Sequence, residues 1–465
     1  MPTQHTAVEA PEATLSRLRA TFTTGRTRPT AWRKAQLRAL RALLTEKHEL
    51  FADALRTDLG KSATETHTTE TGFLVNEIDH TLRHLDRWLS PRRIPVPLAL
   101  APARARTVRE PLGTVLVIAP WNYPLQLSLA PLVGALAAGN CAVVKPSELA
   151  PATSAALAHW LPRALDPEAV AVVEGGVPET TALLDLPFDH IFYTGNGTVG
   201  RIVMTAAARH LTPVTLELGG KSPAVVEPGT DLATAARRIA WGKYMNAGQT
   251  CVAPDYLLAI GETATEIEPH LTTAIHEMYG PSPAASPDYG RIVNDRHLDR
   301  LLALLPDAGR VVTGGEHDRT TRYLAPTVLA DVPVDTPLMR DEIFGPILPI
   351  VPVPSLDAAI TFITGRPKPL ALYAFTASRR TKQRLTAETS SGALSFGVPN
   401  AHLTVPGLPF GGVGASGLGR YHGPHSLDAF SHTKAVLDKP LLLDTLRLAY
   451  PPFTTRKDRL LRRIL

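Results

Sequence analysis

Apolar residues recur along the chain at two spacings, one typical of helices and one of strands. In the first ninety residues, Leu37, Leu40, Leu43 and Leu44 fall on one face of a predicted helix. From residue 112 onward, short apolar runs rich in β-branched residues alternate with stretches of helical spacing. Buried strands separated by helices indicate a parallel, doubly wound sheet. The predicted strands are TVLVIAP, CAVVKPS, AVAVVEG, DHIFYTG and PVTLEL, and the predicted helices cover 125–138, 152–161 and 198–208.

A second series of strands and helices follows Lys221. AVVEP and YLLAIG are predicted strands, with helices expected around 233–245 and ending near Tyr279. Residues 90–111 (SPRRIPVPLALAPARARTVREP) combine proline, arginine and alanine, and they predict an extended arm between compact parts. A chain of 465 residues is too long for one ordinary core, so these parts are expected to be separate domains.

The charge balance changes this picture little. Lysine and arginine number 48 and aspartate and glutamate 43, a net charge of +5 that is small for a chain of this size. The densest basic run, residues 456–463 (RKDRLLRR), could meet an anionic membrane or a nucleic acid. A solvated terminal helix is the favoured interpretation, and weak contact with a membrane surface stays open. The interleaved aromatic and basic residues of a nucleic-acid binder do not occur, so no nucleic-acid partner is expected.

The sequence predicts neither secretion, nor a membrane span, nor a metal site. The N-terminus lacks a charged segment followed by an apolar one. The longest apolar span, 125–144, is interrupted by Pro131 and Gly134, which indicates a buried helix leading into a strand. The two cysteines, Cys141 and Cys251, offer neither a disulfide framework nor a zinc spacing. A cytoplasmic protein without a metal or a transmembrane anchor is therefore expected.

Two features suggest chemistry. Gly195, Gly197 and Gly200 in TGNGTVG match G-x-G-x-x-G between a predicted strand and helix, where backbone N–H groups would face a pyrophosphate. Glu217, at the end of PVTLEL, has the spacing of a ribose-binding carboxylate. It could equally be a general base, with Cys251 in MNAGQTCVAPD as the nucleophile. Cys251 could also be a packed core thiol or a metal ligand, and these motifs by themselves leave the choice open.

Seven motifs occur in the order typical of aldehyde dehydrogenases, and the resemblance extends from about residue 12 to residue 455. KYMNAGQTCVAPDY, GRYHGPHSLDAFSH and YPPFT are most similar to the class 3 branch, which oxidises aromatic and medium- to long-chain fatty aldehydes. The resemblance implies an α/β fold of aldehyde dehydrogenase type, with two doubly wound Rossmann-like domains and a small β-arm for oligomerisation. The seven motifs are PWNYP, VVKPSE, FYTGNGTVG, LELGGKSP, NAGQTCVAPDY, EIFGP and LPFGGVGASGLGRYHG.

Carried over by position, the resemblance implies roles for individual residues. Cys251 matches the family's nucleophile, Asn122 the amide of its oxyanion hole, and Glu217 its general base, which replaces the ribose assignment. The aldehyde would form a thiohemiacetal and then a thioester on Cys251, which water activated by Glu217 hydrolyses to the carboxylic acid. Cys141 remains a small core residue. The residues matching contacts to NAD or NADP are Lys145, Glu148, Gly195, Asn196, Gly197, Thr198, Val199, Gly200, Glu342 and Phe344, and those matching the aldehyde tunnel are Tyr123, Trp241, Met245 and Phe410.

The resemblance also implies domain limits and a homodimer in which the arms pair between subunits. It leaves the cofactor open, because Glu148 would repel the 2′-phosphate of NADP, yet class 3 relatives with that residue accept both cofactors. The expected parts are an NAD(P)-binding domain (1–89 and 112–215, with 400–424 returning to it), a catalytic domain (216–399), an oligomerisation arm (90–111 and 425–450) and a basic tail (451–465).

The chain departs from the class 3 pattern in three places. Ala247 is often a second cysteine, Gly197 stands where threonine or serine is usual, and residues 396–400 (FGVPN) replace an expected Val-Asn-Asp. The last change alters the expected shape of the cleft. Two rival functions are a CoA-acylating aldehyde dehydrogenase and a non-catalytic binding protein of the same fold. Glu217 argues against the first, since acylating enzymes generally lack this base, and the intact set of catalytic residues argues against the second.

Overall fold

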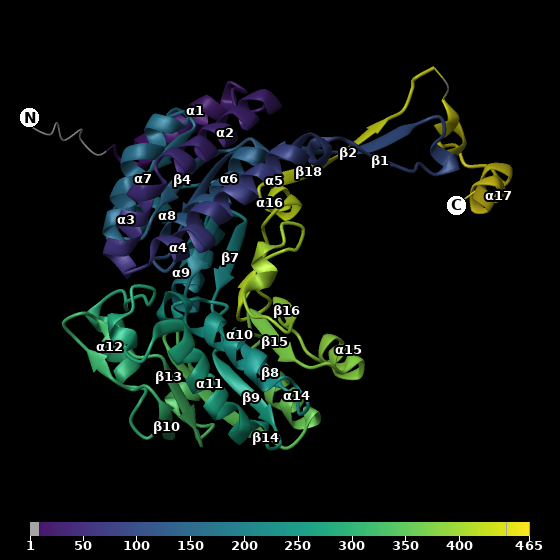
Figure 1. Cartoon of the computed structure of the whole chain (residues 1–465). Helices are drawn as coiled ribbons and strands as arrows, with labels where there is room; N and C mark the ends of the chain where they lie inside the picture. The colour runs from purple at the N-terminus through teal and green to yellow at the C-terminus, as the bar shows by residue number, and fades with distance from the viewer. Residues whose placement is uncertain (1–8, 443, 465) are drawn as a thin grey trace, which may run out of the picture.

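The computed structural model describes residues 9–442 and 444–464, which form two α/β lobes and a projecting arm (Figure 1). A six-stranded sheet lies in the upper lobe of Figure 1 and a seven-stranded sheet in the lower lobe. Both sheets are mainly parallel, which confirms the predicted α/β fold class. Residues 1–8 of the predicted first domain, Leu443 of the predicted arm and Leu465 of the predicted tail lie outside the described residues.

The first sheet has the strand order β17-β7-β6-β3-β4-β5, and only β17 runs antiparallel to its neighbour. Its central strands are the predicted apolar runs, and they are buried because helices cover both faces. All the strands and helices predicted for this part form, whereas helix α8 was not predicted, because its eight residues are too few to show a clear helical pattern. The strands are β3 (Thr114–Ile118), β4 (Cys141–Lys145), β5 (Val170–Val172), β6 (His190–Gly195), β7 (Val214–Leu218) and β17 (Gly417–Leu418), and the helices are α6 (Pro124–Ala138), α7 (Pro151–Ala164), α8 (Val177–Leu184) and α9 (Gly197–Ala208).

Helix α6 is the centre of the upper lobe. All of its residues are buried, as expected for a helix that is apolar on every side. Helices α2 and α5 pack against it, and the four leucines of the predicted N-terminal helix face are all buried. The N-terminal helices are α1 (Pro11–Thr23), α2 (Thr30–Glu46), α3 (His48–Leu59), α4 (Ala63–Thr66), the π-helical turn η1 (His67–Thr71) and α5 (Gly72–Leu89).

The second sheet has the strand order β10-β13-β14-β9-β8-β15-β16, and it is parallel apart from β10. A small antiparallel ribbon, β11 with β12, lies beside it. The strands are β8 (Pro223–Val226), β9 (Tyr256–Ile260), β10 (Arg310–Thr313), β11 (His317–Asp318), β12 (Tyr323–Leu324), β13 (Thr327–Ala330), β14 (Ile347–Val353), β15 (Ala371–Phe375) and β16 (Ala393–Phe396), and the helices are α10 (Leu232–Tyr244), α11 (Thr263–Tyr279), α12 (Asp295–Leu302), α13 (Pro337–Arg340), α14 (Leu356–Thr364) and α15 (Arg379–Glu388).

Residues 219–222 join the two sheets. Strand β7 leaves the carboxyl edge of the first sheet, and β8 enters the amino edge of the second sheet directly afterwards. The boundary predicted between residues 215 and 216 therefore falls inside β7. Because the connection is so short, the carboxyl edge of the first sheet and the amino edge of the second meet where the lobes join.

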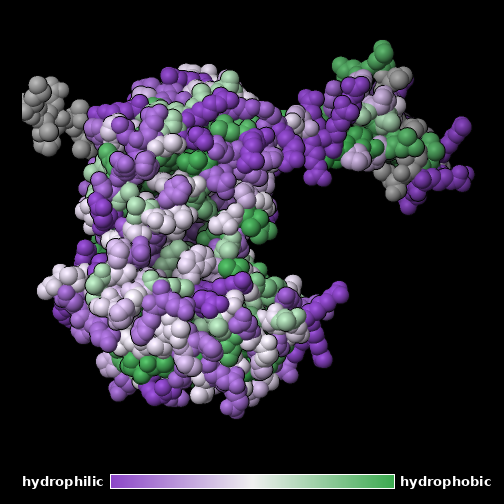
Figure 2. Space-filling model, viewed as in Figure 1, coloured by the Kyte–Doolittle hydropathy of each residue, from purple (hydrophilic) through white to green (hydrophobic). Residues whose placement is uncertain are grey.

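The arm is a three-stranded antiparallel sheet of β1 (Arg92–Ile94), β2 (Arg104–Pro111) and β18 (Ser431–Asp438). Helix α16 (Pro424–Ala429), which falls in the segment predicted for the arm, packs against α5 and α6 as well as against β18. Apolar surface gathers at the far end of the arm (Figure 2). Its strongly exposed apolar residues are Leu98, Leu437, Leu441, Leu442 and Phe453.

The basic tail forms helix α17 (Thr455–Ile464) at the end of the arm (Figure 1). Acidic Asp458 pairs with Arg462 one turn later, at 2.9 Å, as expected for a solvated helix. Throughout residues 9–442 and 444–464, no helix combines the length and the apolar character needed to cross a membrane.

The burial of α6 generates a test of the core. Leu132→Ala removes a fully buried side chain and is expected to lower the free energy of unfolding by about 2–5 kcal/mol. Leu50→Ala makes the same change on helix α3, where the side chain is 36% exposed, and serves as the matched control. Thermal unfolding followed by circular dichroism measures both. Equal midpoints for the two variants would contradict the central role of α6.

Candidate active site

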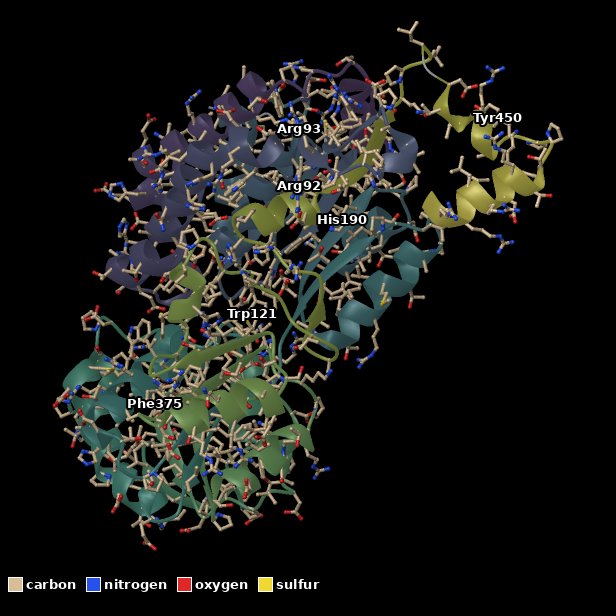
Figure 3. All side chains as sticks on the ribbon, turned by 90° about the vertical axis from the view of Figure 1, so that its right-hand side faces the viewer. Arg92, Arg93, Trp121, His190, Phe375 and Tyr450 are labelled. Carbon is tan, nitrogen blue, oxygen red and sulfur yellow. The ribbon has the colours of Figure 1, made fainter. Side chains whose placement is uncertain are left out.

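Most of the predicted site residues lie on loops, strand ends or helix starts at the two facing sheet edges. Asn122, Glu148 and the glycine turn follow strands β3, β4 and β6 of the first sheet. Cys251 and Glu342 precede strands β9 and β14 of the second sheet. Trp121, next to Asn122, lies at the level where the two lobes meet (Figure 3). The carboxyl edge of an open parallel sheet is the usual place for a ligand.

Cys251 lies in the loop between α10 and β9. Its side chain is partly exposed, whereas Cys141 is buried within β4. Burial, followed by the nearby carboxylates of Glu342 and Glu217, raises the pKa of the Cys251 thiol to about 12. The backbone N–H groups of Cys251 and Val252 act in the opposite direction. The thiol is therefore protonated at neutral pH unless a base takes its proton.

A left-handed turn precedes Cys251 and shapes its loop. Asn246, Ala247 and Gly248 have φ values of 53°, 51° and 74°, so α10 ends before them. A side chain at Gly248 would overlap with the backbone carbonyl of Gly345, which explains the requirement for glycine. The turn therefore packs the cysteine loop against the loop that precedes β14.

Gln249 stabilises this loop through both the nitrogen and the oxygen of its side-chain amide. Its Nε2 donates to Asn246 O at 3.0 Å and to Arg291 O at 2.9 Å, and its Oε1 accepts from Val293 N at 3.0 Å. The carbonyl of Gln249 accepts from Asn122 Nδ2 at 3.0 Å. This last bond ties the predicted oxyanion amide to the loop of the predicted nucleophile.

Asn122 and Tyr123 belong to the short loop between β3 and α6. Both are buried, and the hydroxyl of Tyr123 lies 2.6 Å from Thr250 Oγ1. Two independent hydrogen bonds thus hold the Asn122–Tyr123 pair beside the residues that directly precede Cys251. The structure thus brings Asn122 and Tyr123 next to the loop of Cys251, although Cys251 follows them by about 130 positions in the sequence.

Glu217 lies on β7, opposite Gly417 of β17. It is 2% exposed, so its carboxylate is buried and does not reach an open rim. Neither of its carboxylate oxygens has a hydrogen-bond partner among the described residues. Burial raises the pKa of Glu217 well above its ordinary value. A buried carboxyl group of raised pKa near a thiol is typical of a catalytic acid or base.

Glu342 and Phe344 lie on the loop before β14. Burial, with the Asp255 carboxylate, raises the pKa of Glu342 to about 8. Its carboxylate packs against Gly219, where any side chain would overlap with it. Phe344 has a φ of 47° and meets Trp121 edge to face at 5.3 Å. A non-glycine residue in this conformation is strained, which is common at functional sites.

The predicted cofactor residues follow strands on either side of β3. Lys145 is buried and lies 3.6 Å from Glu148, which is 47% exposed. Asn196 caps α9 by accepting from Val199 N at 3.0 Å, and the first turn of this helix contains Gly197 and Thr198. A cation, an accessible carboxylate and N–H groups at a helix start fit the hydroxyl and phosphate groups of NAD or NADP. Two glycines are needed for packing, because side chains at Gly195 and Gly200 would collide with Tyr193 and Leu218.

The predicted tunnel residues differ in exposure. Tyr123 and Phe410 are buried, Met245 is partly buried and Trp241 is 42% exposed. Trp241 precedes Met245 by one helical turn, so both lie on one side of the end of α10. Phe410 adjoins His402 at 6.3 Å between ring centres, beside the loop of residues 396–400.

Several buried polar residues at this site were not predicted. Lys61 and Glu70 lie under the loop of Asn122, and both are completely buried. Lys243 has no hydrogen-bond partner for its Nζ in the described part of the chain, and burial lowers its pKa to about 8. Tyr421 is buried beside Phe410, at 5.7 Å between rings. Lys243 and Tyr421 stand within the quoted motifs KYMNAGQTCVAPDY and GRYHG, so the motifs were a signal for them, whereas no pattern marks Lys61 or Glu70.

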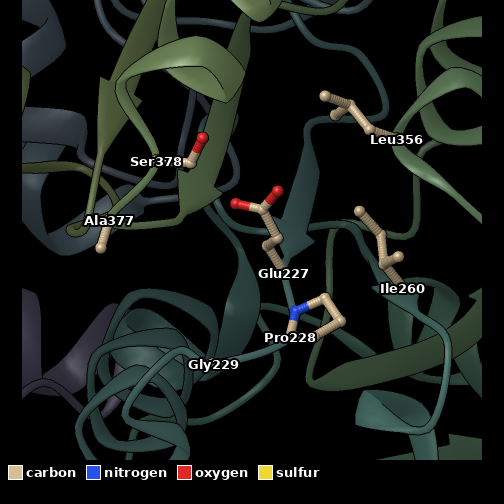
Figure 4. A pocket seen from close by; sticks show the side chains of 7 residues that line it. All are labelled: Glu227, Pro228, Gly229, Ile260, Leu356, Ala377 and Ser378. Carbon is tan, nitrogen blue, oxygen red and sulfur yellow. The ribbon is translucent and has the colours of Figure 1, made fainter.

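A pocket of about 440 Å³ lies at the other edge of the second sheet (Figure 4). Glu227 in this pocket accepts hydrogen bonds from the hydroxyls of Thr376 and Thr381. The pocket follows the carboxyl ends of β8, β9 and β15, whereas Cys251 precedes the amino end of β9. It is therefore separate from the predicted active site. Its lining residues are Glu227, Pro228, Gly229, Ile260, Leu356, Ala377 and Ser378.

Comparison with known sequences gives a consistent result. The profile of the "Aldehyde dehydrogenase family" matches residues 3–436. The chain is 52% identical to human "Aldehyde dehydrogenase family 3 member B1" over 449 residues, 96% of each chain. It is 49% identical to mouse "Aldehyde dehydrogenase family 3 member A2" over 447 residues, 96% of this chain and 92% of the relative.

Solved structures agree with the sequence comparison. A structure described as the substrate-bound state of Staphylococcus aureus AldH superposes with a TM-score of 0.95 and 42% identity, covering 98% of this chain and all of the other. A Mycobacterium tuberculosis aldehyde dehydrogenase complexed with NAD+ has a TM-score of 0.84 and 29% identity, covering 94% and 92%. The chain therefore belongs to the aldehyde dehydrogenase family, as a relative of family 3, and is an NAD(P)-dependent oxidoreductase that acts on aldehydes.

Proposed function

We propose that this enzyme oxidises aromatic or medium- to long-chain aliphatic aldehydes to carboxylic acids, with Cys251 as the nucleophile and Glu217 as the general base. The observation that carries the proposal is the meeting of three groups at the facing sheet edges. These are a partly exposed thiol, a buried carboxyl group with no hydrogen-bond partner among the described residues, and the Asn122 amide bonded to the cysteine loop.

The first step is attack on the aldehyde carbon. Because the pKa of the Cys251 thiol is raised, a base must take its proton and release it to solvent as the sulfur adds to the carbonyl carbon, and this proton is the one that each turnover produces. The carbonyl oxygen then becomes an oxyanion. Asn122 uses one N–H of its amide on Gln249 O, which leaves the other for this oxygen, and the backbone N–H of Cys251 is the second donor.

The remaining steps regenerate the thiol. Bound NAD or NADP supplies the two-electron acceptor for the hydride that leaves the thiohemiacetal carbon. A thioester on Cys251 remains. Glu217 takes a proton from water as the oxygen adds to the thioester carbon, the C–S bond breaks, and the proton returns to the sulfur as the acid leaves. A carboxyl group of raised pKa is suited to this shuttle, because its carboxylate is a stronger base toward water than an ordinary glutamate.

Apolar side chains support the choice of a bulky aldehyde. Tyr123, Met245 and Phe410 would line the path to Cys251, with the exposed Trp241 at its entrance. An apolar, aromatic lining rewards large apolar substrates more than acetaldehyde. The rings of Phe410 and His402 lie beside residues 396–400, where this chain departs from the class 3 pattern. We therefore expect the width of the substrate path to differ from that of class 3 relatives.

The arm supports a homodimer. Its far end exposes several large apolar side chains, which a second copy would cover. The pairing of arms between subunits is part of this proposal. A cytoplasmic location stays a prediction, and so does weak contact of the basic helix α17 with a membrane surface.

The reaction is tested first by removing the thiol. Cys251→Ala is expected to abolish the reduction of NAD and NADP with benzaldehyde and octanal, because no thiohemiacetal can form. Cys141→Ala is the matched control, and it should keep the wild-type kcat because Cys141 is buried in β4, away from the cleft. Steady-state absorbance at 340 nm measures both. Turnover in Cys251→Ala would refute Cys251 as the nucleophile. Turnover of the wild-type enzyme only after addition of CoA would indicate the acylating reaction.

The raised pKa values predict how thiol reactivity depends on pH. The pKa of Glu342 is about 8, so its negative charge appears above this pH and then opposes ionisation of Cys251. Glu342→Gln should therefore react with iodoacetamide at the wild-type rate below pH 7 and roughly three- to tenfold faster near pH 9–10, equivalent to about one pKa unit or less. Rates are measured by mass spectrometry on Cys251 with Glu262→Gln, on the exposed surface, as the control. A slower reaction of Glu342→Gln than of the wild type above pH 8 would contradict the proposed effect of the Glu342 charge on Cys251.

The cofactor preference depends on Glu148 in this proposal. An accessible carboxylate beside the ribose would repel a 2′-phosphate by about 1 kcal/mol at protein-surface dielectric. Glu148→Gln should raise kcat/KM for NADP about fivefold relative to NAD, with little change in kcat. An unchanged ratio of the two values would remove Glu148 from cofactor selection.

A further inference from the structure

A completely buried ion pair lies beneath the loop that carries Asn122. Lys61 Nζ and Glu70 Oε1 are 2.5 Å apart, and neither side chain is exposed. Lys61 follows the end of α3, and Glu70 lies in the π-helical turn η1. Neither residue has a part in the reaction described above, so the pair needs a separate explanation.

Lys61 directs its charge to three groups. It donates to Glu70 Oε1 and, at 3.0 Å, to the backbone carbonyl of Asn122. Its ammonium also lies 3.9 Å from the ring centre of Tyr123, a close cation–π contact. Two of the three contacts of this ammonium therefore fall on consecutive residues of the β3–α6 loop.

Glu70 binds the next part of the same segment. Its Oε2 accepts from Leu125 N at 2.9 Å and from Gln126 N at 3.0 Å. These N–H groups belong to the first turn of α6 and have no partner within the helix. A carboxylate is favoured at this end of a helix by the helix dipole as well as by the hydrogen bonds. The ion pair thus holds the loop from below and the helix that follows it at its start.

The loop is anchored on its opposite side by the cysteine loop. Asn246 Nδ2 donates to the Asn122 carbonyl at 2.7 Å, so this carbonyl accepts from Lys61 and from Asn246 together. The Asn122 side chain donates to Gln249 O at 3.0 Å. With its backbone and its amide both held, Asn122 has little freedom to move relative to the thiol.

Stability alone is a poor reason for such a pair. Removing two charges from water is costly, and apolar side chains of similar size often serve equally well in a core. A buried pair whose contacts fall on the β3–α6 loop and on the first turn of the helix that follows it is better explained by the position that it imposes on them. A shift of about 1 Å in a catalytic group can reduce the rate about 100-fold.

We propose that the Lys61–Glu70 pair is a positioning device that holds Asn122 in the orientation needed to stabilise the oxyanion. This inference rests on the proposed function, in which Asn122 donates to that oxygen. Lys61 and Glu70 are positioning residues, because neither touches the substrate. Lys61 acts through the backbone carbonyl of Asn122, and Glu70 acts through the first turn of α6.

A double-mutant cycle tests the proposal on the full-length enzyme. Lys61→Met is expected to lower kcat/KM for benzaldehyde about 10- to 100-fold, and Asn122→Ala about 100- to 1000-fold. If Lys61 acts through Asn122, the double variant should match Asn122→Ala within about twofold. The KM for NAD should stay at its wild-type value in Lys61→Met.

Arg33→Met is the matched control. Arg33 is a buried cation that donates to Ala137 O at 3.1 Å, at the opposite end of α6. Its loss removes a comparable contact from the same helix without touching Asn122. The midpoint temperature of thermal unfolding should therefore fall in both Lys61→Met and Arg33→Met, whereas kcat/KM should fall only in Lys61→Met.

A second variant covers the case in which Lys61→Met does not fold. Lys61→Met with Glu70→Gln removes both charges of the pair, so Glu70 is not left as an unpaired buried carboxylate, and the variant should show the same loss of kcat/KM and the same coupling to Asn122→Ala. Wild-type kcat/KM in the folded variants, or losses that multiply with Asn122→Ala, would overturn the positioning role. An inactive wild-type enzyme, or activity that survives Cys251→Ala, would instead mean that the proposed function itself is wrong.

Discussion

The short connection between the two sheets is the constraint on which the site depends. Residues 219–222 take the chain from the carboxyl end of β7 directly to the amino end of β8. Gly219, in this connection, packs directly against the Glu342 carboxylate, which a Cβ at this position would displace. Loops that leave one sheet therefore meet loops that enter the other.

This meeting of edges collects acidic groups in a place that water hardly reaches. Glu217, Glu342 and the thiol of Cys251 each have a raised pKa, and the carboxylates raise that of the thiol. Burial, the main cause of all three shifts, thus disfavours the charged form of each group. An environment of this kind suits a reaction in which the nucleophile is needed as an anion only while substrate is bound. The same burial leaves both oxygens of Glu217 without a hydrogen-bond partner among the described residues, and this lack of compensation is consistent with its raised pKa.

The layers around the cleft then act as supports. Helix α6 is rigid because it is buried on every side, and it presents Asn122 and Tyr123 directly before its first turn. The left-handed turn at 246–248 and the side chain of Gln249 give the cysteine loop a single conformation. The arm is different in kind, because it projects away from both lobes and ends in exposed apolar side chains (Figure 2). The predicted catalytic parts are supported within one chain, whereas the end of the arm leaves large apolar side chains uncovered in this chain.

Local patterns in the sequence determined the fold class and most of its strands and helices. Apolar runs such as TVLVI and CAVVK identify themselves, because a strand buried on both faces has no polar positions. The motif around Cys251 likewise marked the loop that the structure brings to the cleft. Helix α8 escaped prediction because its eight residues carry too weak a pattern, and α16 was assigned to the arm because nothing in its sequence shows that it packs on α5 and α6.

Only the tertiary structure decided the surroundings of each group. Spacing left Glu217 open between a ribose ligand and a base, because the answer depends on burial and on neighbours that come from distant segments. The left-handed turn at 246–248 reads locally as the end of a helix, and its close contact with Gly345 exists only in the folded chain. The same holds for Lys61 and Glu70, which look like surface residues in a polar stretch. Their charges are buried because the β3–α6 loop closes over them, and contacts between residues so far apart leave no periodic trace in the sequence.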